Sequence, residues 1–182
     1  MPTVFTHPVV PLALGLGLGR NIVSPRLLAA GIVASTLPDL DVIAFRLGIA
    51  YAADLGHRGF SHSLLFAALA ALLGACAWRV LHTRFIRAFV FLFVVTASHG
   101  VLDAFTNGGL GIALLWPWSS QRYFAPWQVI AVSPIGFGFF SARGAAVLLS
   151  ELKWVWLPAA GGGLLLAALR CYVKRWLKSS AR

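Results

Sequence analysis

The chain has 182 residues, a net charge of +10 at pH 7, and a composition that is 59% hydrophobic and only 11% charged. Soluble domains contain roughly 25% charged residues, so this composition excludes a soluble globular protein and indicates one integral membrane domain, residues 1–182. The positive charge does not indicate a nucleic-acid partner, because the basic residues lie at the ends of apolar segments and not in one run.

Five apolar segments follow one another and predict an all-α, polytopic transmembrane helix bundle with about five spans. They cover residues 4–19, 22–37, 62–81, 86–105 and 154–173. The first arginine, Arg20, follows the first apolar run, so we expect a retained span and not a cleaved signal peptide. The second span should end before Pro38, because proline removes a helical N–H and clashes with the preceding turn.

Residues 106–153 form a long connection that is rich in glycine, proline and aromatic residues. Its stretch LLWPWSSQRYFAPWQVI places Trp116, Trp118 and Trp127 around polar side chains. Amphipathic aromatic residues favour the membrane–water boundary, so we expect an interfacial segment here. Asp54 and Glu151 are interpreted as solvated loop charges.

The distribution of lysine and arginine predicts the orientation of the bundle. If the connection between the first two spans is cytoplasmic, the cytoplasmic side holds no acidic residue and ten basic ones: Arg20, Arg26, Arg79, Arg84, Arg87, Arg170, Lys174, Arg175, Lys178 and Arg182. All five acidic residues then lie on the opposite side. Because basic residues collect in cytoplasmic loops, the N-terminus is predicted to lie outside and the C-terminus in the cytoplasm.

Histidine and aspartate side chains gather at the non-cytoplasmic ends of the predicted spans. These candidate metal ligands are His7, Asp39, Asp41, His57, His62, His99 and Asp103. His99 and Asp103 are four residues apart and therefore share one face of a helix. Asp39 and Asp41 would point the same way in an extended stretch, and Gly59 permits a turn between the two histidines around it. Imidazole and carboxylate suit one or two divalent ions, with Zn²⁺ expected and Mn²⁺ or Fe²⁺ as alternatives.

Other interpretations of these residues stay open. His7 is equally compatible with an interfacial histidine that binds no metal. Asp39 and Asp41 are compatible with helix capping after Pro38. Arg58 suits either contact with an anion or a snorkelling cation at the membrane surface.

Four motifs occur in the order FTHPVVPLALG, LPDLDVIAF, HRGFSHSLLF and SHGVLDAFTNGG. Together they resemble the YdjM-like family of membrane-bound metal-dependent hydrolases over about residues 1–135, whereas residues 136–182 carry no recognised motif. The resemblance implies a metal site on the seven residues named above and a place in the bacterial inner membrane. A looser similarity is to zinc-dependent phospholipase C and P1 nuclease, which cleave phosphodiesters with clustered zinc ions. No histidine follows Asp103, so a three-zinc site is not expected.

The residues and the resemblance together predict a hydrolase at the non-cytoplasmic membrane face that acts on a phosphoester of a lipid or lipid-linked substrate, with an ester or amide bond as an alternative. Asp39 and Asp41 are candidate catalytic residues, one of them as general base. Arg58, and less strongly Arg122, is expected to hold a phosphate oxygen. Two other functions stay open: a transporter or lipid-handling membrane protein with a His/Asp ion or substrate site, and a structural metal site that ties the spans together. The oligomeric state is not predicted.

Overall fold

A computed structural model describes residues 1–134 and 139–180, so Arg182 and the residues 136–138 of the C-terminal segment lie outside the described residues. The described chain is helical. Its α-helices are α1 (Val9–Leu18), α2 (Pro25–Thr36), α3 (Ile43–Arg46), α4 (Leu64–Cys76), α5 (Phe85–Ala104), α6 (Ala142–Glu151) and α7 (Leu157–Ser179). The irregular helical turns given for the described residues are two 3₁₀ turns, η1 (Leu37–Val42) and η2 (Phe60–His62), and a π-helical turn, η4 (Leu152–Trp156).

Among the described residues, three helical segments are long and apolar enough to cross a membrane: Pro25–Arg46, Phe85–Ala104 and Ala142–Ser179. The apolar helices α1 and α4 are shorter, with 10 and 13 residues. At 1.5 Å per residue they measure about 15 and 20 Å, less than the ~30 Å hydrocarbon core. The all-helical membrane fold is therefore confirmed, while the count of five spans stays a prediction.

The helix that contains the predicted last span, 154–173, begins earlier than the span itself. The expected connection 106–153 includes α6, and α6 continues through η4 into α7 as one segment of 38 residues. The reason is an amphipathic pattern: Gly144, Val147 and Glu151 are buried at helical spacing, while the outer face carries Arg143. Two charged residues lower the local hydropathy, so an apolar run cannot reveal this helix.

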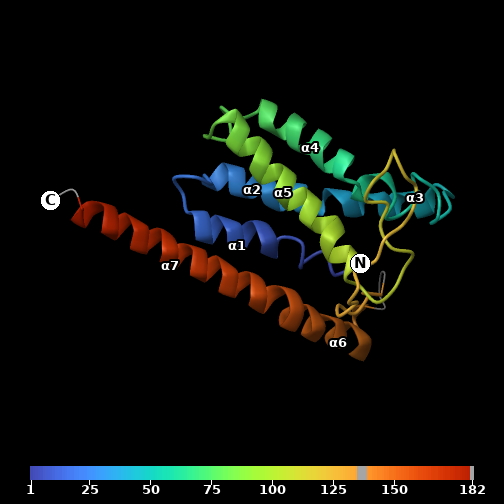
Figure 1. Cartoon of the computed structure of the whole chain (residues 1–182). Coiled ribbons are helices and arrows are strands. Elements are labelled where there is room, and N and C mark those ends of the chain that lie inside the picture. Colours follow the sequence, from blue (N-terminus) through green and yellow to red (C-terminus); the bar gives the residue numbers. More distant parts are fainter. Residues whose placement is uncertain (135–138, 181–182) are drawn as a thin grey trace.

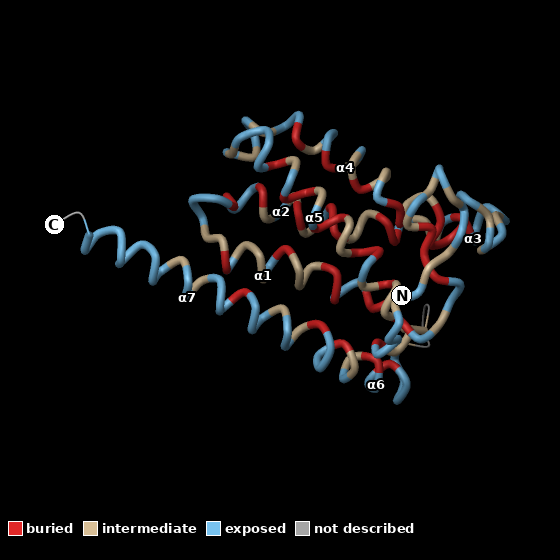
Figure 2. The backbone as a smooth tube through the Cα atoms, in the orientation of Figure 1, coloured by how far each residue is buried: buried red, intermediate tan, exposed pale blue. Residues whose placement is uncertain are grey.

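The five longest apolar helical segments lie lengthwise beside one another (Figure 1). α4 packs on α5, α2 packs on α5, and α1 packs on α7. The α1–α2 and α4–α5 connections and the end of α7 lie at one end of the bundle, and α3, α6 and the long loop lie at the other (Figure 1). The C-terminal half of α7 projects from the bundle and is largely exposed (Figure 2).

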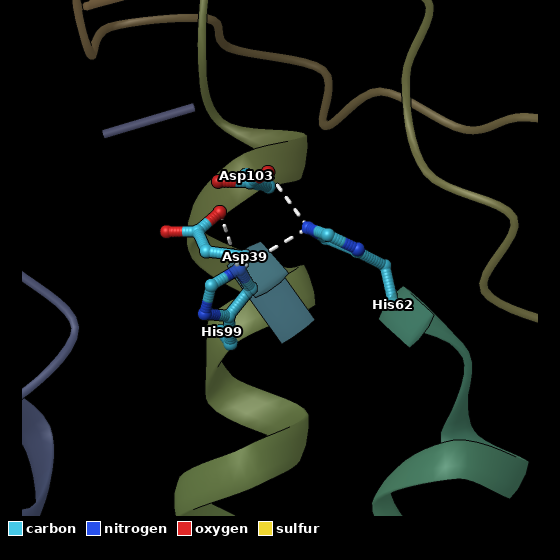
Figure 3. A group of neighbouring side chains, drawn as sticks. All are labelled: Asp39, His62, His99 and Asp103. Carbon is cyan, nitrogen blue, oxygen red and sulfur yellow. Dashed lines mark hydrogen bonds and ion pairs between the residues drawn. The ribbon is translucent and has the colours of Figure 1, made fainter. Parts of the chain in front are cut away.

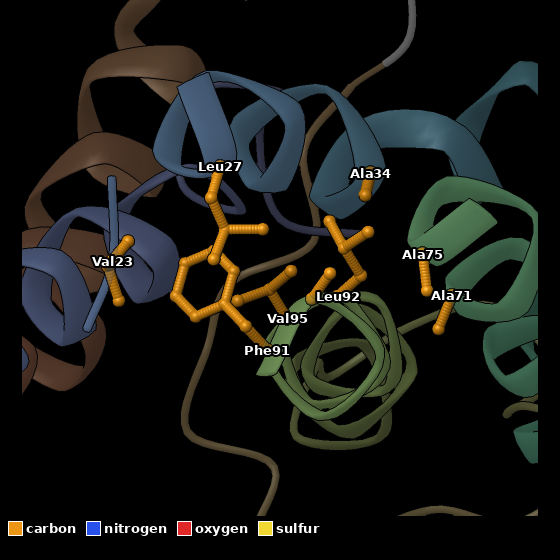
Figure 4. Packing of buried hydrophobic residues seen from close by; sticks show 9 residues of the cluster. Val23, Leu27, Ala34, Ala71, Ala75, Phe91, Leu92 and Val95 are labelled. Atoms are coloured by element: carbon orange, nitrogen blue, oxygen red, sulfur yellow. The ribbon is translucent and has the colours of Figure 1, made fainter. Parts of the chain in front are cut away.

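Small residues let the helices approach closely, as is common in membranes. Ala71 and Ala75 of α4 face Leu92 of α5 within a core that also contains Leu27 and Phe91 (Figure 4). The outer faces carry exposed leucines, which in a bilayer contact lipid.

The contact between α1 and α7 depends on glycine. A Cβ added at Gly163 would lie 2.8 Å from the carbonyl oxygen of Ala13, and one added at Gly17 would lie 2.7 Å from Leu166 Cβ. Both distances are too short for a larger residue without movement of the helices. α1 is therefore in close contact with the N-terminal half of α7.

The α-helix α2 ends at Thr36, before Pro38 as predicted, and the chain then continues in helical turns to Arg46. The side chain of Ser24 caps α2 by accepting a hydrogen bond from the Leu27 N–H at 3.0 Å. After Thr36 the chain tightens into η1, whose first turn contains Pro38, where a missing N–H costs little. Asp39 and Asp41 consequently lie in a 3₁₀ turn, and the expectation of an extended stretch was wrong.

Candidate metal centre

Four buried side chains converge at the end of the bundle that carries α3 and α6. Asp39 comes from η1, His62 from η2, and His99 and Asp103 from one face of α5 (Figure 3). One donor atom from each lies within 4.8 Å of the other three. Segments far apart in the sequence thus bring two imidazoles and two carboxylates to one point.

The distances within this group suit a shared cation. The His62 Nε2 atom is 3.2 Å from Asp103 Oδ2, and the His99 Nε2 atom is 3.3 Å from Asp39 Oδ1. The two Nε2 atoms are 3.1 Å apart. All four oxygens of Asp39 and Asp103 are buried, and within the described residues none accepts a hydrogen bond of normal geometry. Two imidazoles and two carboxylates at these distances fit Zn²⁺ or a similar divalent ion.

His7 reaches the same point from the segment that precedes α1. Its Nε2 atom is 3.7 Å from Asp39 Oδ2 and 3.9 Å from Asp103 Oδ1. Its ring stacks on His99 with a centroid distance of 3.6 Å. Burial first, and then the neighbouring His99, lower the pKa of His7 to about 3. His7 is therefore neutral at pH 7, and a ring nitrogen is available as a fifth donor.

Asp41 lies outside the group of four and binds the residues around it. Its carboxylate accepts hydrogen bonds from the Ser61 hydroxyl at 2.5 Å and from the Arg58 N–H at 3.0 Å. It also lies 2.5 Å from His57 Nδ1 and 3.2 Å from His62 Nδ1. The structure therefore places Asp41 and His57, both predicted ligands, one layer away from the convergence point, where Asp41 orients His62.

A second contact orients the other imidazole. The His99 Nδ1 atom lies 2.7 Å from the carbonyl oxygen of Ser35, which makes Nδ1 the proton-bearing nitrogen. The lone pair of Nε2 then faces Asp39 and His62. Ser35 and Ser61 could not be predicted as part of the site, because a serine in an apolar helix or loop carries no signal of its own.

Arg58 is fully buried, and its guanidinium is occupied by the protein. The Nε atom is 3.0 Å from Asp103 Oδ2, and the terminal nitrogens donate to the Gly108 carbonyl at 2.8 Å and to the Thr106 hydroxyl at 2.9 Å. These contacts differ from the predicted phosphate contact: Arg58 neutralises a carboxylate of the site instead.

Arg122 also binds the protein. Its guanidinium donates to the carbonyl oxygens of His57, Tyr51 and Ala53 at 3.0, 3.0 and 3.1 Å. It fastens the long loop over the residues that precede η2. Asp54 is exposed, as expected for a solvated loop charge.

Glu151 was interpreted wrongly as a solvated charge. It is fully buried at the end of α6, where it accepts hydrogen bonds from the Thr3 N–H at 2.5 Å, the Thr3 hydroxyl at 2.7 Å and the Thr6 hydroxyl at 2.7 Å. Its spacing from Gly144 and Val147 was the available signal, since the three positions share one helix face.

The charges of the site predict competition between protons and metal. Burial opposes protonation of His62, which precedes α4, but the carboxylates of Asp103 and Asp41 outweigh burial and raise its pKa to about 9. His62 is thus protonated at pH 7 in the metal-free protein, and zinc binding is expected to release about one proton. Below a pKa of about 9, protons compete with zinc for the His62 ring, and this competition weakens as the pH rises. The apparent zinc affinity should therefore increase between pH 6 and pH 8.

Calorimetric zinc titrations in buffers of different ionisation enthalpy measure this proton release. The exposed His82 gives a matched control, because His82→Ala leaves the site intact and should release the same number of protons. Binding heats that do not depend on the buffer, with one affinity at pH 6 and pH 8, would contradict the prediction.

Comparisons with known proteins agree with the membrane fold. The profile of the family described as "YdjM inner membrane protein" matches residues 1–177, so the similarity extends well beyond the motif-bearing residues 1–135. The chain is 48% identical over 179 residues to "Inner membrane protein YbcI" of Escherichia coli (strain K12), and the match covers 96% of this chain and 100% of that protein. No solved structure matches. The three long apolar helices and both similarities lead to one conclusion: the chain belongs to the YdjM inner membrane protein family and is an integral protein of the inner membrane.

Proposed function

We propose that this protein is a metal-dependent hydrolase that acts at the non-cytoplasmic face of the inner membrane on a phosphoester of a lipid or lipid-linked substrate. The observation that carries the proposal is the convergence of Asp39, His62, His99 and Asp103, with carboxylate oxygens that are buried and, within the described residues, accept no hydrogen bond of normal geometry. Ionisable groups at membrane depth are costly and are therefore functional by default.

The donor set favours a catalytic metal over a structural one. Structural zinc sites are built mostly from cysteine and histidine, whereas this group contains two carboxylates and has His7 beside it as a fifth donor. The four residues of the group would hold the ion together with His7. Bound there, a divalent metal supplies Lewis acidity that polarises a phosphate oxygen and lowers the pKa of water.

Asp39 is the donor best placed to exchange protons with substrate and water. Its side chain is 9% exposed, whereas the side chains of His62, His99 and Asp103 are fully buried. Asp39 therefore marks the open side of the group, and we assign it the role of general base. Asp41 acts through His62, whose ring it orients, and Arg58 stabilises the charge of Asp103.

The charge distribution supports the proposed orientation. The α1–α2 and α4–α5 connections and the end of α7, which carry the basic residues predicted to be cytoplasmic, lie at the end of the bundle opposite the site (Figure 1). In this orientation the N-terminus and the site are outside, the C-terminus is cytoplasmic, and all five apolar helical segments cross. Trp118 and Trp127, 80% and 72% exposed, belong to the loop at the site end, as suits a membrane–water boundary. A site at the membrane–water boundary lies at the depth of the lipid headgroups.

Metal analysis followed by a substrate screen tests the function. We expect detergent-purified protein to contain one or two zinc, manganese or iron ions per chain, and the metal-loaded protein to cleave a member of a panel of phospholipids and polyprenyl phosphoesters. Asp39→Asn should abolish turnover, while Asp54→Asn, at an exposed carboxylate, should retain it. If the loaded protein cleaves none of the panel and proteoliposomes show an ion flux that His99→Ala abolishes, the hydrolase function is wrong and transport is favoured.

A further inference from the structure

Glu151 is a buried carboxylate in a membrane-spanning segment, and its partners belong to the opposite end of the chain. Two of these partners are the hydroxyls of Thr3 and Thr6, and the third is the Thr3 N–H. Among the described residues these donors are neutral and Glu151 forms no ion pair. Burial of a carboxylate on neutral donors is costly, which calls for a role beyond packing.

The helix is distorted where these contacts occur. The π-helical turn η4 starts directly after Glu151 and ends at Trp156. The Trp156 Nε1–H donates to the Thr6 hydroxyl at 2.8 Å, so Trp156 and Glu151 both form a hydrogen bond with Thr6. In a regular α-helix, residues five apart point about 140° apart. A π turn closes over five residues and brings them onto one face, and such turns occur frequently at functional sites.

The two hydrogen bonds that hold the Thr6 hydroxyl matter because the next residue in the chain is His7. His62 and His99 are each oriented through the second ring nitrogen, by Asp41 and by the Ser35 carbonyl. Within the described residues, neither ring nitrogen of His7 has a hydrogen-bond partner. Stacking on His99 fixes the plane of the His7 ring but not its distance from Asp39 and Asp103. The position of His7 must therefore be set by its backbone.

We infer that Glu151 is a positioning residue of the metal centre, which holds Thr3 and Thr6 so that His7 faces Asp39 and Asp103 as the fifth donor. The inference rests on the proposed function, because it requires that the site binds metal. It gives the C-terminal segment, which carries none of the sequence motifs, a part in the site. A purely structural staple between α6 and the N-terminal segment is the competing explanation.

Metal affinity in a double-mutant cycle separates the two explanations. Zn²⁺ and Co²⁺ dissociation constants are measured by chelator competition for the parent, Glu151→Ala, His7→Ala and the double variant. Loss of a residue that orients a ligand typically costs 10- to 100-fold in metal affinity, so we expect Glu151→Ala to weaken binding roughly 10-fold or more. In the His7→Ala background the same substitution should have no further effect. The Co²⁺ absorption spectra of the two single variants should change in the same direction.

Further variants keep the test valid if Glu151→Ala folds poorly. Thr6→Val retains shape but removes the hydroxyl, and should weaken metal binding in the same His7-dependent way. Glu151→Gln keeps the hydrogen-bonding length and should restore most of the affinity. Val147→Ala removes buried side-chain volume one turn earlier on the same face, and should leave metal affinity unchanged.

Each outcome decides one question. If Glu151→Ala or Thr6→Val weakens binding equally with and without His7, or if Glu151→Ala binds metal like the parent, the positioning role is overturned and the metal site stands. If the parent binds metal but cleaves no substrate, only the hydrolase function fails. A parent protein that binds no metal overturns both.

Discussion

Asp103→Asn is expected to reduce bound metal to background, with a loss of affinity greater than about 100-fold, because it removes a direct donor and not merely its support. Asparagine preserves the shape of the side chain but removes its negative charge. The Asp103 oxygens face His62 and His7 at 3.2 and 3.9 Å, and Arg58 at 3.0 Å. The variant therefore loses a ligand and leaves a buried guanidinium without its counter-charge.

Elemental analysis of the purified variant after zinc supplementation measures this loss, and chelator competition gives its size. Asp54→Asn is the matched control, since it makes the same chemical change at an exposed position on the same side of the bundle. Full zinc content in Asp103→Asn would remove Asp103 from the site.

Arg58→Met is expected to cause the largest loss of stability, about 3–5 kcal/mol in the free energy of unfolding of the metal-free protein. Methionine fills much of the space of the arginine stem but leaves the buried Asp103 carboxylate without its guanidinium partner. Because a bound divalent cation neutralises the same carboxylate, the loss should be smaller with zinc than with a chelator.

Denaturant unfolding in detergent, followed by tryptophan fluorescence, provides the measurement. The exposed Arg46 serves as the reference, because Arg46→Met should change stability by less than about 0.5 kcal/mol. Adding Asp103→Asn to Arg58→Met should recover part of the loss, since the pair is then replaced as a unit. Equal stabilities for Arg58→Met and Arg46→Met would show that the ion pair contributes nothing.

The convergence of the polar residues could be predicted because it depends only on which end of each apolar segment they occupy. His99 and Asp103 needed nothing more than helical spacing, and α5 (Phe85–Ala104) differs from the predicted span 86–105 by one residue. The division between Asp39 at the centre and Asp41 around it could not be predicted. Residues two apart point alike in a strand but about 120° apart in a 3₁₀ turn, and only the fold decides which applies.

The C-terminal segment was difficult for a different reason. A hydropathy pattern assigns charged residues to loops, and α6 contains Arg143 and Glu151. The pattern therefore predicts a loop where the structure has a helix. Glu151 is instead buried because residues at the other end of the chain supply its hydrogen bonds. Such long-range partners have no signature in the local sequence. Two of the groups that bind the Arg58 guanidinium likewise lie after α5, far from Arg58 in the sequence.

The close contact between the first and last apolar helices has a consequence for biosynthesis. The ribosome completes the N-terminal segment first, yet the residue that fixes it, Glu151, is translated after Asp39, His62, His99 and Asp103. A nascent chain therefore carries the four converging residues while His7 is still unanchored. The segment before α1 can make its hydrogen bonds with Glu151 only after residue 151 has been translated, so this contact between distant parts of the chain forms after all four converging residues have been made.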